Sequence, residues 1–534
     1  MNKKILLSIV CIFSITITRA QVIEQGPIVG GVTNKQAKIF VRTSVPATVV
    51  LQYSKFANYS SYSSLTTTTT SANQNAYTFS LTALTVNCTY YYRILLNGNY
   101  YFSGRSFKTF PNPGTAGYYK ILSGSCVNFP QNVPIFDLMA TENANLFIEN
   151  GDLGYPDTTD NMPSDGLCFS RVYSAVVNSY KAKYASPQLM NLLHNMPMDY
   201  VYDDHDYAND NSSKTSTSYY SGLIVQEVAF PASCRTNSIK GYNKLFPHYT
   251  LNNVNTNGIY HSFKLGNAEF FVLDVRSNRS PNTEGLSYTF LGGTFNPPVG
   301  HTILGTTQLN WLVSGLTNST ATWKFIVSPV CFNKAQQTLL NAIATNNIKN
   351  VFVVSGDSHT SAIDDGTNSG IPEMMAANLM QDNSQLANYY STLGFNIWNQ
   401  GGQGLGNSNY NNTYGKIEIF NNDSVKLSII DEFGTLIADY TAPNQNLSPR
   451  IDLQEQKSAY NIFMSGEQLI VKNENSEKEN GTLRIFNSAG ELVKEFPLSG
   501  NEMSAYNLSD ISSGIYLVQL STPSGIKVKK VWKQ

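Results

Sequence analysis

The chain has 534 residues, of which 41% are hydrophobic and 14% are charged, and its formal net charge is −1. This length allows about three domains, and the balanced charge without a long basic block argues against a nucleic-acid-binding surface. A high content of tyrosine, threonine, serine and asparagine favours β-structure with polar turns.

The first 20 residues have the pattern of a secretory signal peptide. Lys3 and Lys4 precede the apolar run Ile5–Ile17, and Thr18-Arg19-Ala20 is a small-x-small cleavage pattern. The run is shorter than the ~20 residues needed to span a bilayer. We therefore expect an exported protein without a transmembrane segment in the mature chain.

The pattern of strands and helices then changes three times along the chain. Alternating strands without helices predict a β-sandwich in residues 21–113. Strands alternating with amphipathic helices predict an α/β domain in residues 114–441. A polar segment with two prolines, residues 442–459, is predicted as a linker, and residues 460–534 as a small β-domain.

Six strands are predicted in the central region, and all but Trp323–Val330, the weak case, end at a polar or metal-binding side chain. In an open α/β sheet, ligands bind outside the carboxyl ends of the strands, so repeated polar ends predict one polar site. A single apolar run that stops at Asp or Gly more often marks only a turn. The predicted strands are Tyr119–Cys126, Ala144–Asp152, Asp199–His205, Ala268–Arg276, Trp323–Val330 and Asn350–His359.

Three of these strand ends are clusters of residues able to bind a metal ion. Together they supply carboxylate, phenol, carboxamide and imidazole groups from separate segments, as a site for a hard cation requires. The clusters are Gly151-Asp152 with Tyr155, Asp203-Asp204-His205 with Asn209, and Gly356-Asp357-Ser358-His359.

The cysteine count adds one further candidate. Five cysteines follow the predicted signal peptide, and an odd number in an oxidising compartment leaves at least one unpaired or bound to another group. Cys126 is our candidate because it lies at the end of a predicted strand in the expected site. A buried free thiol or a disulfide is the alternative.

Taken in order, these motifs resemble those of PhoD-like alkaline phosphatases, which belong to the calcineurin-like metallophosphoesterases. The N-terminal region Gln21–Phe110 is similar to the fibronectin-III-like domain that precedes the catalytic domain in this family. The C-terminal region resembles a type IX secretion sorting domain. The catalytic motifs are Asn150–Tyr155, Asp203–Asp206 with Asn209, Leu273–Arg279, Gly305–Leu312 and Ser355–His359, and the sorting motifs are Leu483–Gly490, Leu508–Val518 and Lys527–Lys533.

The resemblance implies an α/β fold of the metallophosphoesterase type, a layered β-sandwich flanked by helices. An all-β sandwich would precede it, and a small all-β domain would follow. Two positions depart from the family pattern: Tyr202 stands where a tryptophan is frequent, and Leu153 stands where tyrosine or histidine is frequent. Neither change removes a ligand, and both alter the expected shape of the pocket.

The resemblance also implies a ligand set for two metal ions. Cys126, Asp152 and Tyr155 would bind one ion, Asp204 and Asn209 would bind another, and Asp357 would complete the site. Independently of the family, a thiolate with a phenolate suits ferric iron, and carboxylates with a carboxamide suit calcium. The family implies the same Fe³⁺ and Ca²⁺ pair, while Zn²⁺, Mn²⁺ and Mg²⁺ stay open.

The remaining motif residues are assigned to the substrate. We predict that His205 protonates the leaving oxygen, with a supporting hydrogen bond to a ligand as the alternative. Arg276 and Arg279 are predicted to clamp phosphate, with surface salt bridges as the alternative, and Asp274 to orient one of them. His359 is predicted to contact the substrate.

The expected function is that of a secreted, metal-dependent phosphomonoesterase or phosphodiesterase that uses a metal-activated hydroxide. It would reach the cell surface or the medium through the signal peptide and then the type IX secretion machinery. A phospholipase-D-like or phosphotriester hydrolase on the same fold is one alternative. A non-catalytic cell-surface binding protein is the other.

Overall fold

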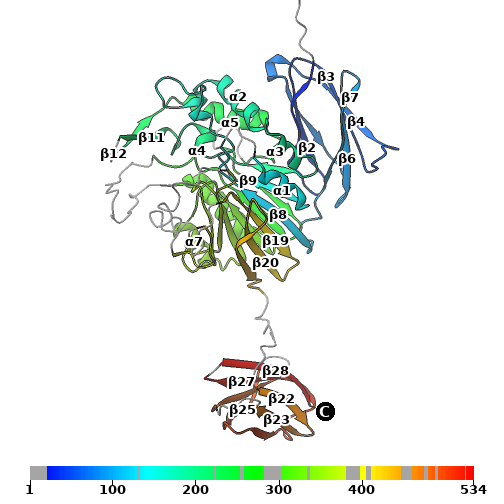
Figure 1. Cartoon of the computed structure of the whole chain (residues 1–534), viewed down its shortest axis with the longest axis vertical. Coiled ribbons are helices and arrows are strands. Elements are labelled where there is room, and N and C mark those ends of the chain that lie inside the picture. The colour runs from blue at the N-terminus through cyan, green and yellow to red at the C-terminus, as the bar shows by residue number, and fades with distance from the viewer. Residues whose placement is uncertain are drawn as a thin grey trace, which may run out of the picture. The chain divides into compact units, whose positions relative to one another are not determined.

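A computed structural model describes most of the chain after the first 20 residues. The described residues are 21–128, 133–221, 224–252, 258–281, 302–332, 337–380, 397–403, 411–446, 460–473, 479–487, 491–523 and 525–533. The predicted signal peptide therefore lies outside them. The chain forms two compact units, Met1–Asn446 and Leu447–Gln534 (Figure 1). In the described residues, no helix has the length and apolar character needed to cross a membrane.

The N-terminal part of the first unit consists of two antiparallel sheets around an apolar core that includes Phe40 and Tyr92. The strand around Thr66 lies at the edge of its sheet, and its serines and threonines are mostly exposed. One sheet has the order β1 (Ile23–Gly30), β2 (Ala37–Thr43), β5 (Ala76–Leu81), and the other β4 (Ser63–Thr68), β3 (Thr48–Ser54), β6 (Thr89–Leu96), β7 (Asn99–Lys108), with the short helix η1 (Ser71–Asn73).

Two six-stranded mixed sheets form the centre of the first unit. The predicted layered α/β fold is confirmed, and antiparallel strands from about residue 413 onward complete one of the sheets. The first sheet has the order β10 (Met198–Tyr200), β9 (Leu146–Glu149), β8 (Tyr118–Gly124), β19 (Thr413–Phe420), β20 (Ser424–Asp431), β21 (Leu436–Pro443). The second has the order β13 (His261–Leu265), β14 (Ala268–Val272), β15 (Trp323–Val327), β16 (Val351–Ser355), β18 (Glu373–Ala376), β17 (Ser361–Asp364).

A row of aromatic rings fills the space between the two sheets. Phe263, Phe270, Phe325 and Phe352 are paired across neighbouring strands, and their ring centroids lie 4.9, 4.8 and 5.3 Å apart in succession. Cross-strand pairs of this kind are the main stabilising contacts of a sheet. Because side chains alternate along a strand, the neighbouring residues face the opposite side and pack under helices.

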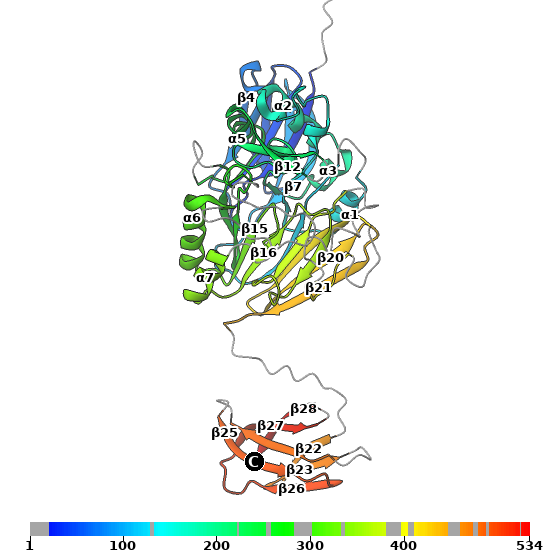
Figure 2. The same ribbon diagram turned by 90° about the vertical axis from the view of Figure 1, so that its left-hand side faces the viewer.

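The helices cover the outer faces of the sheets. Figure 2 shows α6 and α7 beside β15 and β16, where Leu312 and Leu339 share an apolar cluster with Ile326 and Val353. The helices are α1 (Ile135–Thr141), α2 (Tyr173–Lys183), α3 (Pro187–Leu192), α4 (Asp204–Tyr207), α5 (Ser233–Leu245), α6 (Gly305–Asn318) and α7 (Gln337–Thr345), with the short helices η2 (Pro156–Thr158) and η3 (Phe169–Arg171) and the hairpin β11 (Ser216–Ser221)–β12 (Ile224–Ala229).

The second unit has two antiparallel sheets around its own apolar core, which includes Leu469 and Val518. Strand β21 ends at Pro443, so the first residues of the range predicted as a linker still pair with β20. The sheets have the orders β22 (Tyr460–Ser465), β23 (Gln468–Asn473), β26 (Met503–Asn507) and β25 (Leu492–Leu498), β24 (Gly481–Phe486), β27 (Gly514–Thr522), β28 (Gly525–Lys533).

Candidate metal centre

The loops that follow the parallel strands of both central sheets meet at one place. Strands β8, β9 and β10 are parallel in one sheet, and β14, β15 and β16 are parallel in the other. The Asn150 amide links the two sets, since its Nδ2 donates to Ser123 Oγ at 3.0 Å and to the Ser355 carbonyl at 3.5 Å. All six predicted strands are present, but each ends before its polar residues, which lie in these loops.

Two of these loops approach each other so closely that one position requires glycine. Gly151 has a φ of +111°, and a Cβ added there would lie 2.5 Å from Asp203 Cβ. Because glycine alone tolerates both the backbone conformation and the contact, the Gly151-Asp152 motif allows the loop after β9 to touch the loop after β10. The neighbouring carboxylates of both loops thus face a common space.

Three overlapping groups of side chains offer ligand atoms that lie within 4.8 Å of one another. Asp152 and Asp204 each occur in two of the groups, so they join the groups into one centre. The groups are Cys126, Asp152 and His359; Asp152, Asp204 and His205; and Asp203, Asp204 and Asp357.

Several residues of this centre have an unusual backbone. Cys126, Asp152, Asp357 and His359 have φ values of 64°, 60°, 74° and 53°. A left-handed conformation is unfavourable for residues with a Cβ and is concentrated at functional sites. The surrounding fold therefore imposes these conformations on the residues that carry the candidate ligand atoms.

Tyr155 joins the first group through its hydroxyl. Its Oη lies 3.3 Å from Asp152 Oδ2 and 3.0 Å from His359 Nε2, and Cys126 Sγ lies 3.9 Å from the same Asp152 oxygen. Burial, and then the charge of Asp152, raises the pKa of both the Tyr155 phenol and the Cys126 thiol. A cation in this place would reverse that effect and favour the phenolate and thiolate.

The donor set fits a cation by a second test. Asp152 Oδ1 is a buried carboxylate oxygen without a hydrogen-bond partner in the described part of the chain, and Asp204 Oδ1 makes no hydrogen bond there but lies 3.4 Å from Arg276 Nη2. Burying a carboxylate oxygen without a partner is costly. Burial, and then the charges of Asp204 and Asp203, raises the pKa of Asp152 well above its usual value, and a cation beside Asp152 would favour its charged form.

Arg276 supplies much of the positive charge that is present. Its guanidinium is fully buried and makes a two-pronged ion pair with Asp203, in which Nη2 lies 3.1 Å from Oδ2. The same Nη2 lies 2.7 Å from Asp357 Oδ1 and 3.4 Å from Asp204 Oδ1. Burial would raise the pKa of Asp204, but Arg276 and His205 outweigh burial and hold it at about 2.

The Arg276 guanidinium thus pairs with three aspartates, Asp203, Asp204 and Asp357. Arg279, the other predicted clamp, lies in the same loop, and burial followed by the charge of Arg276 lowers its pKa to about 10.

His205 is held in a charged environment next to Tyr155. Its Nδ1 lies 2.6 Å from Asp157 Oδ2, its Nε2 lies 3.8 Å from Asp210 Oδ1, and its ring centroid lies 4.2 Å from that of Tyr155. Burial opposes a charge on the ring, yet Asp204 and Asp157 raise the pKa of His205 to about 9. The two carboxylates therefore favour the protonated form of the ring.

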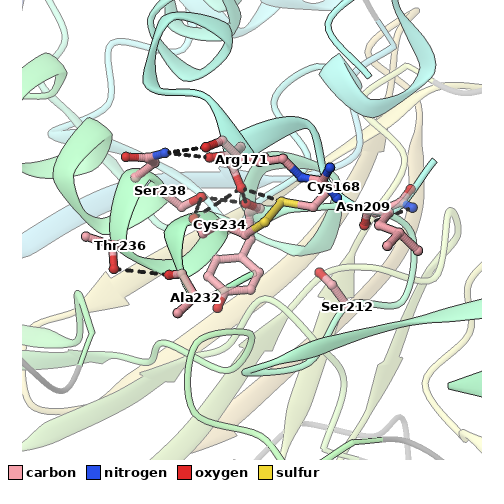
Figure 3. The surroundings of a disulfide bond; sticks show 12 residues. Cys168, Arg171, Asn209, Ser212, Ala232, Cys234, Thr236 and Ser238 are labelled. Atoms are coloured by element: carbon pink, nitrogen blue, oxygen red, sulfur yellow. Dashed lines mark hydrogen bonds between the residues drawn. A yellow bond between two sulfur atoms is a disulfide. The ribbon is translucent and has the colours of Figure 1, made fainter. Parts of the chain in front are cut away.

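A disulfide supports the segment that carries Asp204 and His205 (Figure 3). Cys168 and Cys234 are bonded, which ties the segment before α2 to α5. From this tie, Ser170 and Ser238 both donate to the carbonyl of Tyr207, the last residue of α4, at 2.7 and 2.5 Å. Cys126 stays unpaired and buried, as its assignment as a candidate ligand requires.

Asn209 follows α4, and its side chain is engaged locally. Its Nδ2 donates to the Gly166 carbonyl at 2.7 Å, and its Oδ1 accepts from the Asp210 amide at 2.9 Å. The backbone of this segment does reach the centre, because the Asn211 amide donates to Asp204 Oδ2 at 2.5 Å.

Two other buried carboxylates have partners that the sequence did not indicate. The Asp274 carboxylate, predicted to orient an arginine, accepts from Tyr202 Oη at 2.7 Å and from the Ile259 amide at 2.8 Å, so it braces the loop after β14. Asp199 Oδ2 lies 2.9 Å from His261 Nε2 in a fully buried pair.

Sequence reasoning gave no role to three buried charged residues near the centre, of which Asp206 lies in a named motif. Asp157 orients His205, while Lys183 and Asp206 lie beneath the ligand loops. Asp157 could have been suspected from its position two residues after Tyr155. No signal in the sequence connects Lys183 in α2 with Asp206 in α4.

A layered β-sandwich with this cluster of acidic, thiol and phenol groups at its parallel strand ends is a metallophosphoesterase fold. The chain belongs to the PhoD-like phosphatase family, whose sequence model matches residues 121–446, and it is a phosphoesterase. Residues 465–534 match a secretion system C-terminal sorting domain, which implies the type IX secretion machinery and export.

Solved structures support the fold. The chain is similar to the structure of PhoD at 16% sequence identity with a TM-score of 0.62, covering 84% of this chain and 90% of that one. It is also similar to the purple acid phosphatase PPD1 from yellow lupin (Lupinus luteus) at 12% identity with a TM-score of 0.50, covering 78% and 74%. A comparison with curated protein sequences gives no match.

Proposed function

We propose that the chain is an exported, metal-dependent phosphoesterase that hydrolyses phosphomonoesters or phosphodiesters at the centre around Asp152 and Asp204. The observation that carries this proposal is the buried Asp152 Oδ1, which has no hydrogen-bond partner in the described residues, together with ligand atoms of Asp152, Asp204 and their neighbours that lie within 4.8 Å of one another. When bound, two cations would neutralise phosphoryl charge and acidify a water molecule.

The ligand assignment follows the side chains that face the centre. Cys126, Tyr155 and Asp152 would hold one cation, for which thiolate and phenolate favour Fe³⁺. Asp204 and Asp357, with Asp152 shared, would hold the other, for which carboxylates favour Ca²⁺. Asn209 was expected in this second set, and its carbonyl oxygen would join only after giving up the Asp210 amide.

His205 is the proton donor in this proposal. The hydrogen bond from Nδ1 to Asp157 fixes the ring, and the raised pKa of about 9 keeps a proton on Nε2 for transfer to the leaving oxygen. General acid catalysis of this kind contributes typically ~10²–10⁴ in rate. We assign substrate contacts to Arg279 and His359.

Arg276 has a different part in this proposal from the predicted phosphate clamp. Its Nε and Nη2 bind Asp203, the same Nη2 binds Asp357, and its Nη1 donates to the Ser212 carbonyl at 3.5 Å. Arg276 would therefore hold the acidic residues in place and offset their mutual repulsion, and would act on the substrate only through them.

The proposal is tested with the mature chain and two substrates. Turnover of nitrophenyl phosphate and bis-nitrophenyl phosphate is measured together with the metal content of the purified protein. Asp152→Asn and Asp204→Asn should each abolish turnover of both substrates and lower metal content, with unfolding transitions close to wild type. A ratio strongly in favour of the diester would define a phosphodiesterase.

A matched control uses an aspartate far from the centre. Asp364 is also buried, but its Oδ1 accepts from the amides of Gly366, Asn368 and Ser369. Asp364→Asn should leave metal content and turnover near wild type. Wild-type turnover in Asp152→Asn or Asp204→Asn would overturn the metal assignment.

A further inference from the structure

A buried lysine–aspartate pair lies beneath the two loops that carry the candidate ligands. Lys183 at the end of α2 and Asp206 in α4 form an ion pair in which 1% of each side chain is exposed. The Lys183 ammonium also donates to the Leu153 carbonyl at 2.9 Å and to Tyr200 Oη at 3.1 Å. A buried ion pair is by itself weak support for stability, so its role depends on the groups that it holds.

The Asp206 carboxylate accepts backbone N–H groups from both ligand loops. Its Oδ2 lies 2.5 Å from the Asp152 amide and 3.4 Å from the Leu153 amide, both in the loop after β9. The same oxygen lies 3.2 Å from the Asp203 amide in the loop after β10. One oxygen atom thus bridges the two loops, while Lys183 fixes the other oxygen of the same carboxylate.

The backbone conformation of Asp152 explains why the Asp206 carboxylate is needed between the two loops. Asp152 has a φ of 60°, which a residue with a Cβ adopts only when its surroundings enforce it. The Asp206 oxygen binds the amide of this very residue at the shortest of the three distances. Without that acceptor, the Asp152 backbone could relax, and its carboxylate would lose its fixed position relative to Asp204.

We infer that Asp206, held by Lys183, is a positioning residue that sets the spacing between Asp152 and Asp204 and hence between the two cations. This inference rests on the proposed function, because cations must bind for the spacing to matter. Neither Asp206 nor Lys183 needs to touch a cation or the substrate in this role.

The test compares two double variants of equal charge in the mature chain. Lys183→Met with Asp206→Asn keeps an oxygen that can accept from the loop amides. Lys183→Met with Asp206→Leu has nearly the same size but no acceptor. Replacing Lys183 in both avoids leaving a buried charge without its partner.

We measure iron and calcium content, the Kd for Ca²⁺ by calorimetry, and kcat and KM separately. The Asn variant should stay close to wild type. The Leu variant should bind Ca²⁺ at least ~10-fold more weakly, as is typical when support of a metal ligand is lost, and kcat should fall while KM is unchanged. Equal Ca²⁺ affinities in the two double variants would overturn the inference.

A third variant covers the case in which the Leu variant does not fold. Asp206→Glu keeps the charge and the acceptors but is one methylene longer, so it should push the two loops apart and weaken Ca²⁺ binding. Full Ca²⁺ affinity in a folded Asp206→Glu protein would equally contradict the inference.

Asp199→Asn, which breaks the buried pair with His261, serves as the control for general instability. It should lower the free energy of unfolding without changing the Kd for Ca²⁺, and a matching loss of affinity there would overturn the specific role of Asp206. If wild-type protein binds no cation and hydrolyses no phosphoester, the proposed function itself fails. If wild type does both and the double variants agree, only the positioning role fails.

Discussion

Replacing Arg276 with methionine tests how the acidic centre is kept together. The Arg276 side chain is fully buried, and its guanidinium is bound to Asp203 and Asp357. Removing one partner of a buried ion pair costs about 3–5 kcal/mol. Hydrogen bonds to charged groups contribute about 1.5–3 kcal/mol each, so the bidentate pair with Asp203 alone accounts for this range. We expect the free energy of unfolding to fall by an amount near the upper end of this range, because Asp204 also loses the positive charge beside it.

Bound cations should reduce this loss. A ligand at 100 times its Kd stabilises the folded state by about 2.7 kcal/mol, and the carboxylates freed from Arg276 should bind cations more tightly. The free energy of unfolding is measured by urea denaturation in a chelator and again with saturating Ca²⁺. The difference between Arg276→Met and wild type should shrink when Ca²⁺ is present.

Arg276→Lys is the matched control for charge. It keeps one positive charge but cannot reproduce the bidentate bond, so it should lose less stability than Arg276→Met. A loss below about 1 kcal/mol for Arg276→Met in chelator would refute the reasoning, since buried pairs of this kind should exceed it. A loss of equal size with and without Ca²⁺ would refute it too.

Three further outcomes are expected. If Cys126 and Tyr155 ligate Fe³⁺, the concentrated protein should absorb visible light. Tyr155→Phe should shift or remove the absorption band, and Cys126→Ser should weaken iron retention. A colourless, active wild-type protein, with neither effect in the variants, would exclude the iron assignment. Truncation after residue 457 should leave turnover intact and prevent export, which activity assays and cell fractionation measure. Burial opposes a charge on His261, but Asp199 raises its pKa. The stability gained from this pair should therefore be complete below pH 6.5 and decline as pH rises through the raised pKa. Asp199→Asn should remove this pH dependence in urea titrations at several pH values, and an unchanged pH profile would contradict the prediction.

The sequence was a good guide to the central strands and a poor guide to their ends. Each of the six predicted strands begins within two residues of the observed one, because a run of apolar residues buried on both faces is a strong local signal. The ends were placed too late, since the polar residues that follow are held by contacts with other loops. Asn150 is an example, with bonds to Ser123 and Ser355 from two different sheets.

The candidate centre was predictable where motifs were contiguous. Asp152 and Tyr155, or Asp203 and Asp204, are close in sequence, and the rule for strand ends brings their segments together. The direction in which Arg276 points could not be predicted in the same way, because it depends on three carboxylates from two other segments. The bridge from Lys183 to Asp206 likewise exists only after folding.

The left-handed backbone lowers stability but supports activity at four positions, Cys126, Asp152, Asp357 and His359. Each such conformation costs of order 1–3 kcal/mol for a residue other than glycine, and glycine would remove that cost. A screen for thermal tolerance alone should therefore enrich glycine at these positions among folded variants, and the same variants should lose turnover. The stability lost to these backbone conformations is the cost of holding the reactive side chains in position for hydrolysis. A substitution at any of these four sites that raises heat resistance should therefore lower activity.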